Sequence, residues 1–190
     1  TDQPAGTVEA TEPADTADPT AAPVTGTAGT PSESFGKYMT VKGTAYERLS
    51  KKMESNEALG LYGLTLLPVT LVDLTLIPLS ALTADAAAGA AALEMLGMKD
   101  INIDNAGDKY TITYTDSEGK KARQTAVYDA ATDSVQSSIT DETGKEILFF
   151  EYVAVGKGYA AQYFMVDEKG TTVITAVFDD SSLVAFGLQA

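Results

Sequence analysis

The 190-residue chain contains no cysteine, no histidine and no tryptophan. Without cysteine it has no disulfide framework, no thiol nucleophile and no zinc–thiolate site. Without histidine it lacks the commonest general base and the commonest metal ligand. Few enzyme classes can be built from what remains. We therefore predict a protein that is not an enzyme, with no catalytic residue, no metal site and no cofactor.

Basic residues are also scarce, since 13 Lys and Arg stand against 27 Asp and Glu, giving a formal net charge of −14. The longest basic cluster is Lys120-Lys121-Ala122-Arg123. A polyanion such as nucleic acid would be repelled by most of this surface. The composition therefore predicts no nucleic-acid partner.

The first 36 residues contain acidic residues but no basic one, and they are rich in Thr, Ala and Pro. Such a segment cannot bury enough apolar area to offset its ordering entropy. We predict that residues 1–36 form a disordered acidic linker and that residues 37–190 form a single domain. Linkers of this composition are typical of spacers between an exported domain and an anchor.

The chain begins at Thr1, without Met and without a signal peptide. We interpret it as a mature or trimmed chain whose leader has been removed. An extracellular or cell-surface location follows from this interpretation, with membrane proximity only through a missing N-terminal anchor. The alternative is a tail that carries no anchor.

Residues 44–98 have the sequence pattern of helices. An apolar stripe at helical spacing begins at Tyr46 and predicts an amphipathic helix over residues 46–67, which Pro68 ends or kinks. A second proline, Pro78, divides the apolar stretch that follows. A further helix is predicted after it, with Asp85 near its start and Gly97 as its stop.

From Lys99 onward the apolar residues alternate with a period of two, and turn clusters recur every 12 to 14 residues. This pattern predicts an antiparallel β-meander of about seven or eight strands over residues 99–190. The predicted fold class is therefore α+β, with Pro-broken apolar helices packed on the meander. The turns "TDSEGK", "TDETGK" and "VDEKGT" resemble one another, which either reflects a duplicated hairpin or is a general property of such meanders.

The strands "EILFFEYVAV" and "GYAAQYFMV" are apolar on both faces. Such strands need cover on both sides of the sheet. The helices supply one cover. Sheet curvature, a partner or a ligand supplies the other.

The stretch "LLPVTLVDLTLIPLSAL" over residues 66–82 contains one charge, Asp73. A wall-sorting signal is excluded because Leu71 replaces the required glycine and no basic tail follows. A membrane span is disfavoured by Asp73, whose burial in a bilayer costs about 2.5–3.5 kcal/mol, and by the two prolines. We interpret the stretch as buried helices lying under the sheet.

Four residues are candidates for ligand binding. Asp73 and Glu151 are acids in apolar segments, where a carboxyl group has a raised pKa unless it is paired. Asp73 either takes part in function, caps its segment or meets a lysine. Strand alternation puts Glu151 on one face with Phe149 and Val153, where it either takes part in function, lies at an exposed edge or forms a salt bridge. A paired-carboxylate site requires the two acids to meet in space. Tyr159 and Tyr163 either belong to the core or form an exposed pair that binds glycan or peptide.

Two further patterns suggest sites only weakly. Residues 100–108, "DINIDNAGD", place oxygens at alternate positions, but they lack the glycine and the final acid of a calcium loop. The stretch "GKGYAA" imitates a dinucleotide fingerprint, but a strand follows where a helix is required. We predict a strand and a hairpin turn, respectively.

The acidic Thr/Pro tail and hairpins such as "ITYTDSEGK" and "DETGKEILFFEYV" resemble those of small exported bacterial lipoproteins of unassigned function. The resemblance covers residues 37–190 and carries no site residues. It implies a secreted or cell-surface, non-enzymatic binding module whose partner is a protein, a glycan or an apolar ligand. The alternative is a carrier of lipid or another apolar molecule in a cavity between sheet and helices.

Overall fold

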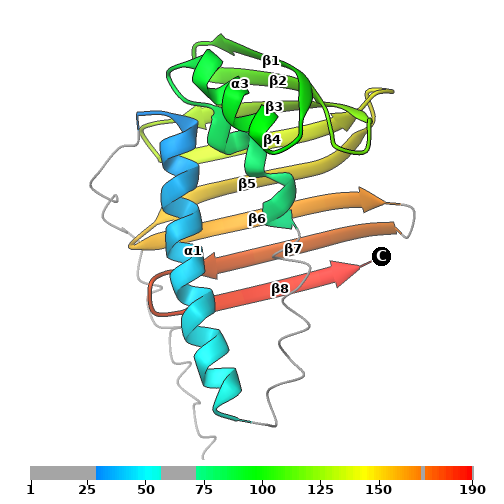
Figure 1. The fold of residues 1–190 in the computed structure, drawn as a ribbon. Helices are drawn as coiled ribbons and strands as arrows, with labels where there is room; N and C mark the ends of the chain where they lie inside the picture. The colour runs from blue at the N-terminus through cyan, green and yellow to red at the C-terminus, as the bar shows by residue number, and fades with distance from the viewer. Residues whose placement is uncertain (1–28, 57–71, 168–169, 190) are drawn as a thin grey trace, which may run out of the picture.

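The computed structural model describes residues 29–56, 72–167 and 170–189, and its fold is α+β (Figure 1). A long helix, α1 (Pro31–Glu54), precedes a 3-10 helix, η2 (Ile77–Ala81), and a short helix, α3 (Ala86–Met95). One eight-stranded sheet follows, formed by β1 (Lys99–Ala106), β2 (Lys109–Thr115), β3 (Lys121–Asp129), β4 (Ser134–Asp141), β5 (Glu146–Val155), β6 (Gly158–Asp167), β7 (Gly170–Phe178) and β8 (Leu183–Gln189).

The strands lie in the order β1 to β8, and each pairs antiparallel with the next strand in the chain. The predicted meander is therefore confirmed, including its start at Lys99. The similar turns after β2 and β4 share one geometry. The carboxylates of Asp116 and Asp141 each accept two backbone N–H groups, and Gly119 and Gly144 adopt positive φ values of 83° and 84°. Only glycine takes that conformation without strain.

Helix α1 begins at Pro31, inside the segment that we expected to be linker. Thr30 caps it by accepting a hydrogen bond from the N–H of Glu33, and Phe35 is buried. Thr-Pro-Ser-Glu is an N-cap followed by proline at the first helical position, which we interpreted only as linker composition. The helix predicted over residues 46–67 overlaps α1 only from Tyr46 to Glu54, and residues 57–71 lie outside the described structure.

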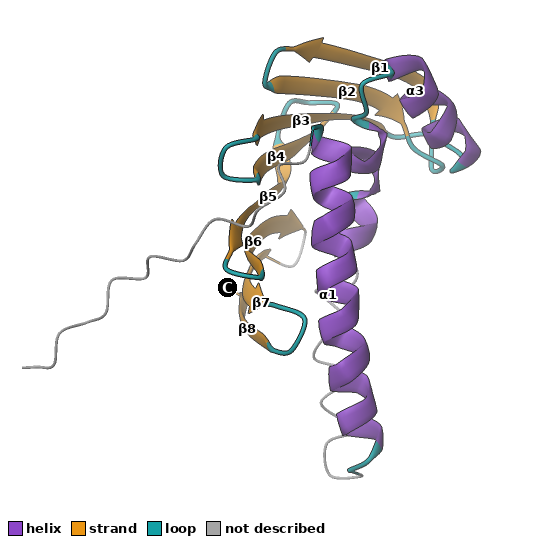
Figure 2. Ribbon diagram, turned by 90° about the vertical axis from the view of Figure 1, so that its left-hand side faces the viewer, coloured by secondary structure: helices purple, strands orange, loops and turns teal. Residues whose placement is uncertain are grey.

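Among the described residues, the helices cover one face of the sheet. Helix α1 crosses β4, β6, β7 and β8, while α3 packs on β1 and η2 (Figures 1 and 2). We call this covered side the inner face and the opposite side the outer face. Within the described residues, no helix is long and apolar enough to cross a membrane.

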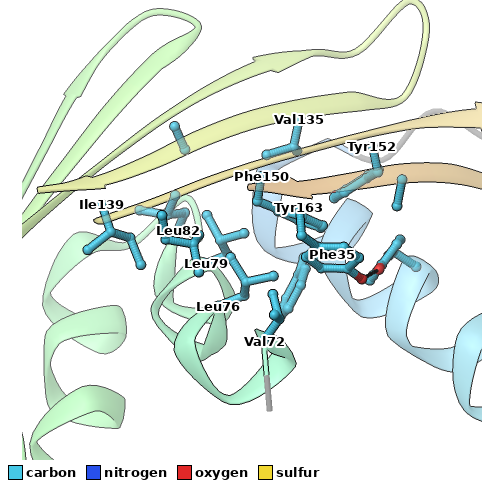
Figure 3. Close-up of a cluster of buried hydrophobic side chains, with 14 of the residues drawn as sticks. Phe35, Val72, Leu76, Leu79, Leu82, Val135, Ile139, Phe150, Tyr152 and Tyr163 are labelled. Carbon is cyan, nitrogen blue, oxygen red and sulfur yellow. Dashed lines mark hydrogen bonds between the residues drawn. The ribbon is translucent and has the colours of Figure 1, made fainter. Parts of the chain in front are cut away.

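From Val72 onward, the apolar stretch lies beside α1 against the inner face, as we expected of a segment buried under the sheet (Figures 1 and 3). Figure 3 shows Leu76, Leu79 and Leu82 pointing at Ile139 and Phe150 of the sheet. Pro78 lies in the first turn of η2, where its missing N–H is not needed. Asp85 caps α3 by accepting two backbone N–H groups, as predicted from its position. The core is therefore a layer of leucine and aromatic side chains.

Candidate functional site

Asp73 forms a buried ion pair with Lys42, a residue that the sequence pattern did not single out. The Nζ of Lys42 lies 2.5 Å from Oδ1 of Asp73, and their side chains are 2% and 12% exposed. The same Nζ donates to the hydroxyl of Tyr163 at 2.7 Å, and that hydroxyl is hydrogen-bonded to the hydroxyl of Tyr38. This polar cluster joins α1, residues 72–75 and β6.

Burial governs the protonation of this cluster. It raises the pKa of the Asp73 carboxyl and lowers the pKa of the Lys42 ammonium, because both charged forms lose hydration, while their mutual attraction opposes both shifts. The Lys42 amine is shielded from solvent, so it offers no nucleophile to a dissolved substrate. We assign the pair to holding α1 against the sheet.

Tyr159 and Tyr163 lie in the core, 4% and 1% exposed, and neither is placed to contact a glycan. The hydroxyl of Tyr159 donates to Oδ2 of Asp133 at 3.0 Å. The ring of Tyr38 stacks on that of Tyr152, with centroids 4.7 Å apart. Tyr159 and Tyr163 are therefore core residues, which is the first of the two interpretations given above, and they do not form an exposed pair.

Glu151 lies on the outer face and does not meet Asp73. Its neighbours along β5, Phe150 and Tyr152, point inward and are buried, so the Glu151 side chain points to the uncovered side. A paired-carboxylate site between Asp73 and Glu151 is therefore not formed. The Glu151 carboxylate accepts one hydrogen bond, from Nε2 of Gln136 at 3.3 Å.

The second half of the outer face, from β5 to β8, combines rows of exposed apolar side chains with one mostly polar row. Two cross-strand rows, Val153–Ala160–Val177–Val184 and Phe149–Phe164–Val173–Leu188, lie on either side of a middle row, Gln136–Glu151–Gln162–Thr175–Phe186. The exposure is greatest on β8, where Val184, Phe186 and Leu188 are 71%, 69% and 57% exposed. The outer face is therefore the side of these two-sided strands that still needs a cover, and no described residue of the chain supplies one.

Two hollows adjoin these surfaces. One of about 380 Å³ lies on the outer face around Glu151, lined by residues that include Ser134, Gln136, Gln162 and Thr175. The other, of about 350 Å³, opens between η2 and the inner face. Its wall is mostly apolar and includes Leu74, Pro78, Met98, Ala122, Ile147, Leu148 and Met165. The second hollow has the size and lining of a small ligand site.

The two weaker sequence patterns form the strand and the hairpin turn that we predicted for them. Residues 100–108 form most of β1 and the turn into β2, and "GKGYAA" is the turn between β5 and β6 followed by β6 itself. Sequence reasoning missed Lys42 and Asp133, because a lysine on an amphipathic helix and an aspartate in a turn are normally solvated. The outer position of Val184, Phe186 and Leu188 could have been found from their alternation along β8.

Comparison of the chain with models of known protein families, with curated proteins and with solved structures gives no match. The site must therefore be interpreted from its own geometry.

Replacing Lys42 tests the buried ion pair. We expect Lys42→Met to lower the free energy of unfolding by about 3–5 kcal/mol, because it leaves the Asp73 carboxylate buried without a cation. The double variant Lys42→Met/Asp73→Asn should lose less. Urea unfolding followed by far-UV circular dichroism measures both. As a control, Lys51→Met on the same helix breaks an exposed pair with Glu47 and should change stability little. Equal losses at Lys42 and Lys51 would contradict the assignment.

The tyrosines predict alkaline unfolding. Burial raises the pKa of Tyr128 to about 12, and it also raises the pKa values of Tyr152, Tyr159 and Tyr163 above 10.0. Because the folded-state pKa is the higher one, the stabilisation is complete below pH 10 and is lost as pH rises through the folded pKa. Phenolate absorbance should therefore rise together with the loss of sheet circular dichroism. A phenolate signal that developed fully near pH 10 with the sheet intact would show that these hydroxyls are accessible.

Proposed function

We propose that the protein is a non-enzymatic interaction module, secreted or held at the cell surface, that binds another protein through the outer face of its sheet. The observation that carries the proposal is the apolar outer face of β5 to β8, whose side chains include Val153, Phe164, Val177, Val184, Phe186 and Leu188. A surface that combines several exposed apolar side chains with polar groups is typical of protein interaction sites. Aromatic and aliphatic side chains on a rigid sheet lose little entropy when a partner orders them.

The two edges of the sheet differ in a way that supports this location. The edge strand β1 carries Lys99, Asp100 and Asp104, has an irregular register and is packed by α3. These features protect an edge from association. The opposite edge, β8, has no charged residue and no proline. Protection at one edge only supports a binding role for the other edge and the face beside it.

The location outside the cell rests on the chain that precedes α1. The acidic Thr/Pro-rich composition of residues 1–28 is typical of the chain between an exported domain and its anchor. The non-enzymatic character is supported by the absence of Cys and His and by the enclosure of Lys42 and Asp73.

Binders selected from a displayed peptide library test the outer face. We expect the double variant Val184→Lys/Phe186→Lys to weaken such binders at least about tenfold, because it places charge where apolar contact is required. Met95→Lys is the matched control, since Met95 is 89% exposed but lies on α3. Titration by biolayer interferometry measures the difference. Binders that lose affinity equally with Met95→Lys, or that are insensitive to both changes, would refute the proposal.

A second candidate function is the carriage of an apolar small molecule. It is favoured by the hollow of about 350 Å³ between η2 and the inner face, with Met98 and Met165 in its wall. Methionine side chains adapt to ligands of different shape. Leu74, which is 59% exposed, lies at its rim and gives the hollow a partly apolar entrance.

Native mass spectrometry tests this carrier function. A carrier should retain an apolar adduct or bind an added fatty acid, and Ala122→Phe, which fills the hollow, should abolish that binding. Val127→Phe is the control, because Val127 lies on the same strand, β3, but is 40% exposed on the outer face. A bare chain that takes up no fatty acid would exclude the carrier function.

A further inference from the structure

Glu151 is the one acid in the middle row of the apolar half of the outer face. Its cross-strand neighbours are Gln136 on β4 and Gln162 on β6. None of the ion pairs formed among the described residues includes Glu151. Its carboxylate thus accepts one amide hydrogen bond and retains unused acceptor positions.

The surroundings of Glu151 combine acceptors with apolar walls. Ser134, Gln136, Gln162 and Thr175 supply hydroxyl and amide oxygens to the hollow of about 380 Å³, and Val153 and Ala160 supply apolar surface. A partner that covered this face with apolar groups alone would bury the carboxylate unpaired, at a cost of several kcal/mol. Such a partner must therefore bring a cationic donor to Glu151.

We propose, building on the function proposed above, that the protein partner inserts an arginine side chain into this hollow. A guanidinium presents a planar fork that pairs with a carboxylate through two parallel hydrogen bonds, and its other N–H groups can donate to the neighbouring amide and hydroxyl oxygens. Its methylene stem can lie on Val153 and Ala160. Lysine fits less well, because a single ammonium cannot match the flat row of acceptors.

The charge of the chain favours a different protein over a second copy. A second copy would carry the same net charge of −14 and would bring its own Glu151 to the shared surface. A partner with exposed arginine is attracted to the acidic protein at long range and is then fixed in register by the ion pair. Apolar contacts along β8 supply the remaining contact area.

Titration with N-acetyl-arginine methylamide, followed by ¹H–¹⁵N NMR on the full chain, tests the hollow directly. We expect saturable shifts at Gln136, Glu151 and Gln162 with a Kd in the millimolar range, weakened by salt. The citrulline analogue has the same shape without the charge and should give at least about tenfold weaker binding. Glu151→Gln should abolish the difference between the two probes. Glu94→Gln, an equal charge change on α3, should preserve it.

Absence of these shifts, equal shifts from the two probes or an unchanged arginine titration in Glu151→Gln would overturn the arginine site. Sedimentation velocity tests whether a second copy of the chain occupies the face instead. A dimer that Phe186→Lys dissociates would show that it does, and would overturn the proposal of a different protein partner. The two proposals fail separately. Library binders that need Phe186 but tolerate Glu151→Gln would retain the function and remove the arginine site. If the arginine probe binds at Glu151 while library binders are insensitive to Val184→Lys/Phe186→Lys, the arginine site is retained and the proposed function is removed.

Discussion

The fold depends on how the polar groups of its tyrosine-rich core are paired. The Tyr38 ring is fully buried, so its hydroxyl cannot reach water. It contacts four rings of the inner face, those of Phe150, Tyr152, Tyr159 and Phe178. That hydroxyl is satisfied by Tyr163, Tyr163 accepts from Lys42, and Lys42 is neutralised by Asp73. A buried polar group left unpaired would cost about 1–3 kcal/mol, and a buried charge more. Each member thus makes the next one necessary.

The contrast between the faces of the sheet follows from this arrangement. On the inner face every charged side chain of the Lys42–Asp73 cluster has a partner within the chain. On the outer face Glu151 has one amide contact and lies among apolar side chains that are exposed. The same strands, β5 to β8, carry both faces. Among the described residues the sheet is covered on one side and open on the other, and the binding surface proposed above lies on the open side.

The sequence predicts the parts of the structure that local chemistry determines. Glycine-containing turns and alternating strands are local signals, and Asp85 caps α3 where its position suggested. The predicted start of the first helix was wrong, because Thr30, Pro31 and Glu33 fit both a linker composition and a helix N-terminus. The burial of Phe35 against the sheet favours the helix, and burial is a tertiary property. The pairing of Lys42 with Asp73 joins positions 31 residues apart through tertiary contact, which no local pattern encodes. The two-sided strands indicated that a second cover is needed, but not which side the helices leave open.

The position of α1 in the chain also affects how the protein is made. Its side chains contact residues far downstream, and the Tyr38 and Tyr163 hydroxyls that meet in the core are separated by 125 positions. During synthesis from the N-terminus, α1 is complete long before β6 exists. Its apolar side must remain exposed, or be held by another protein, until most of the sheet has been translated. The hairpins can form in order as they emerge, so the joining of helix and sheet is necessarily a late event on the ribosome or after release.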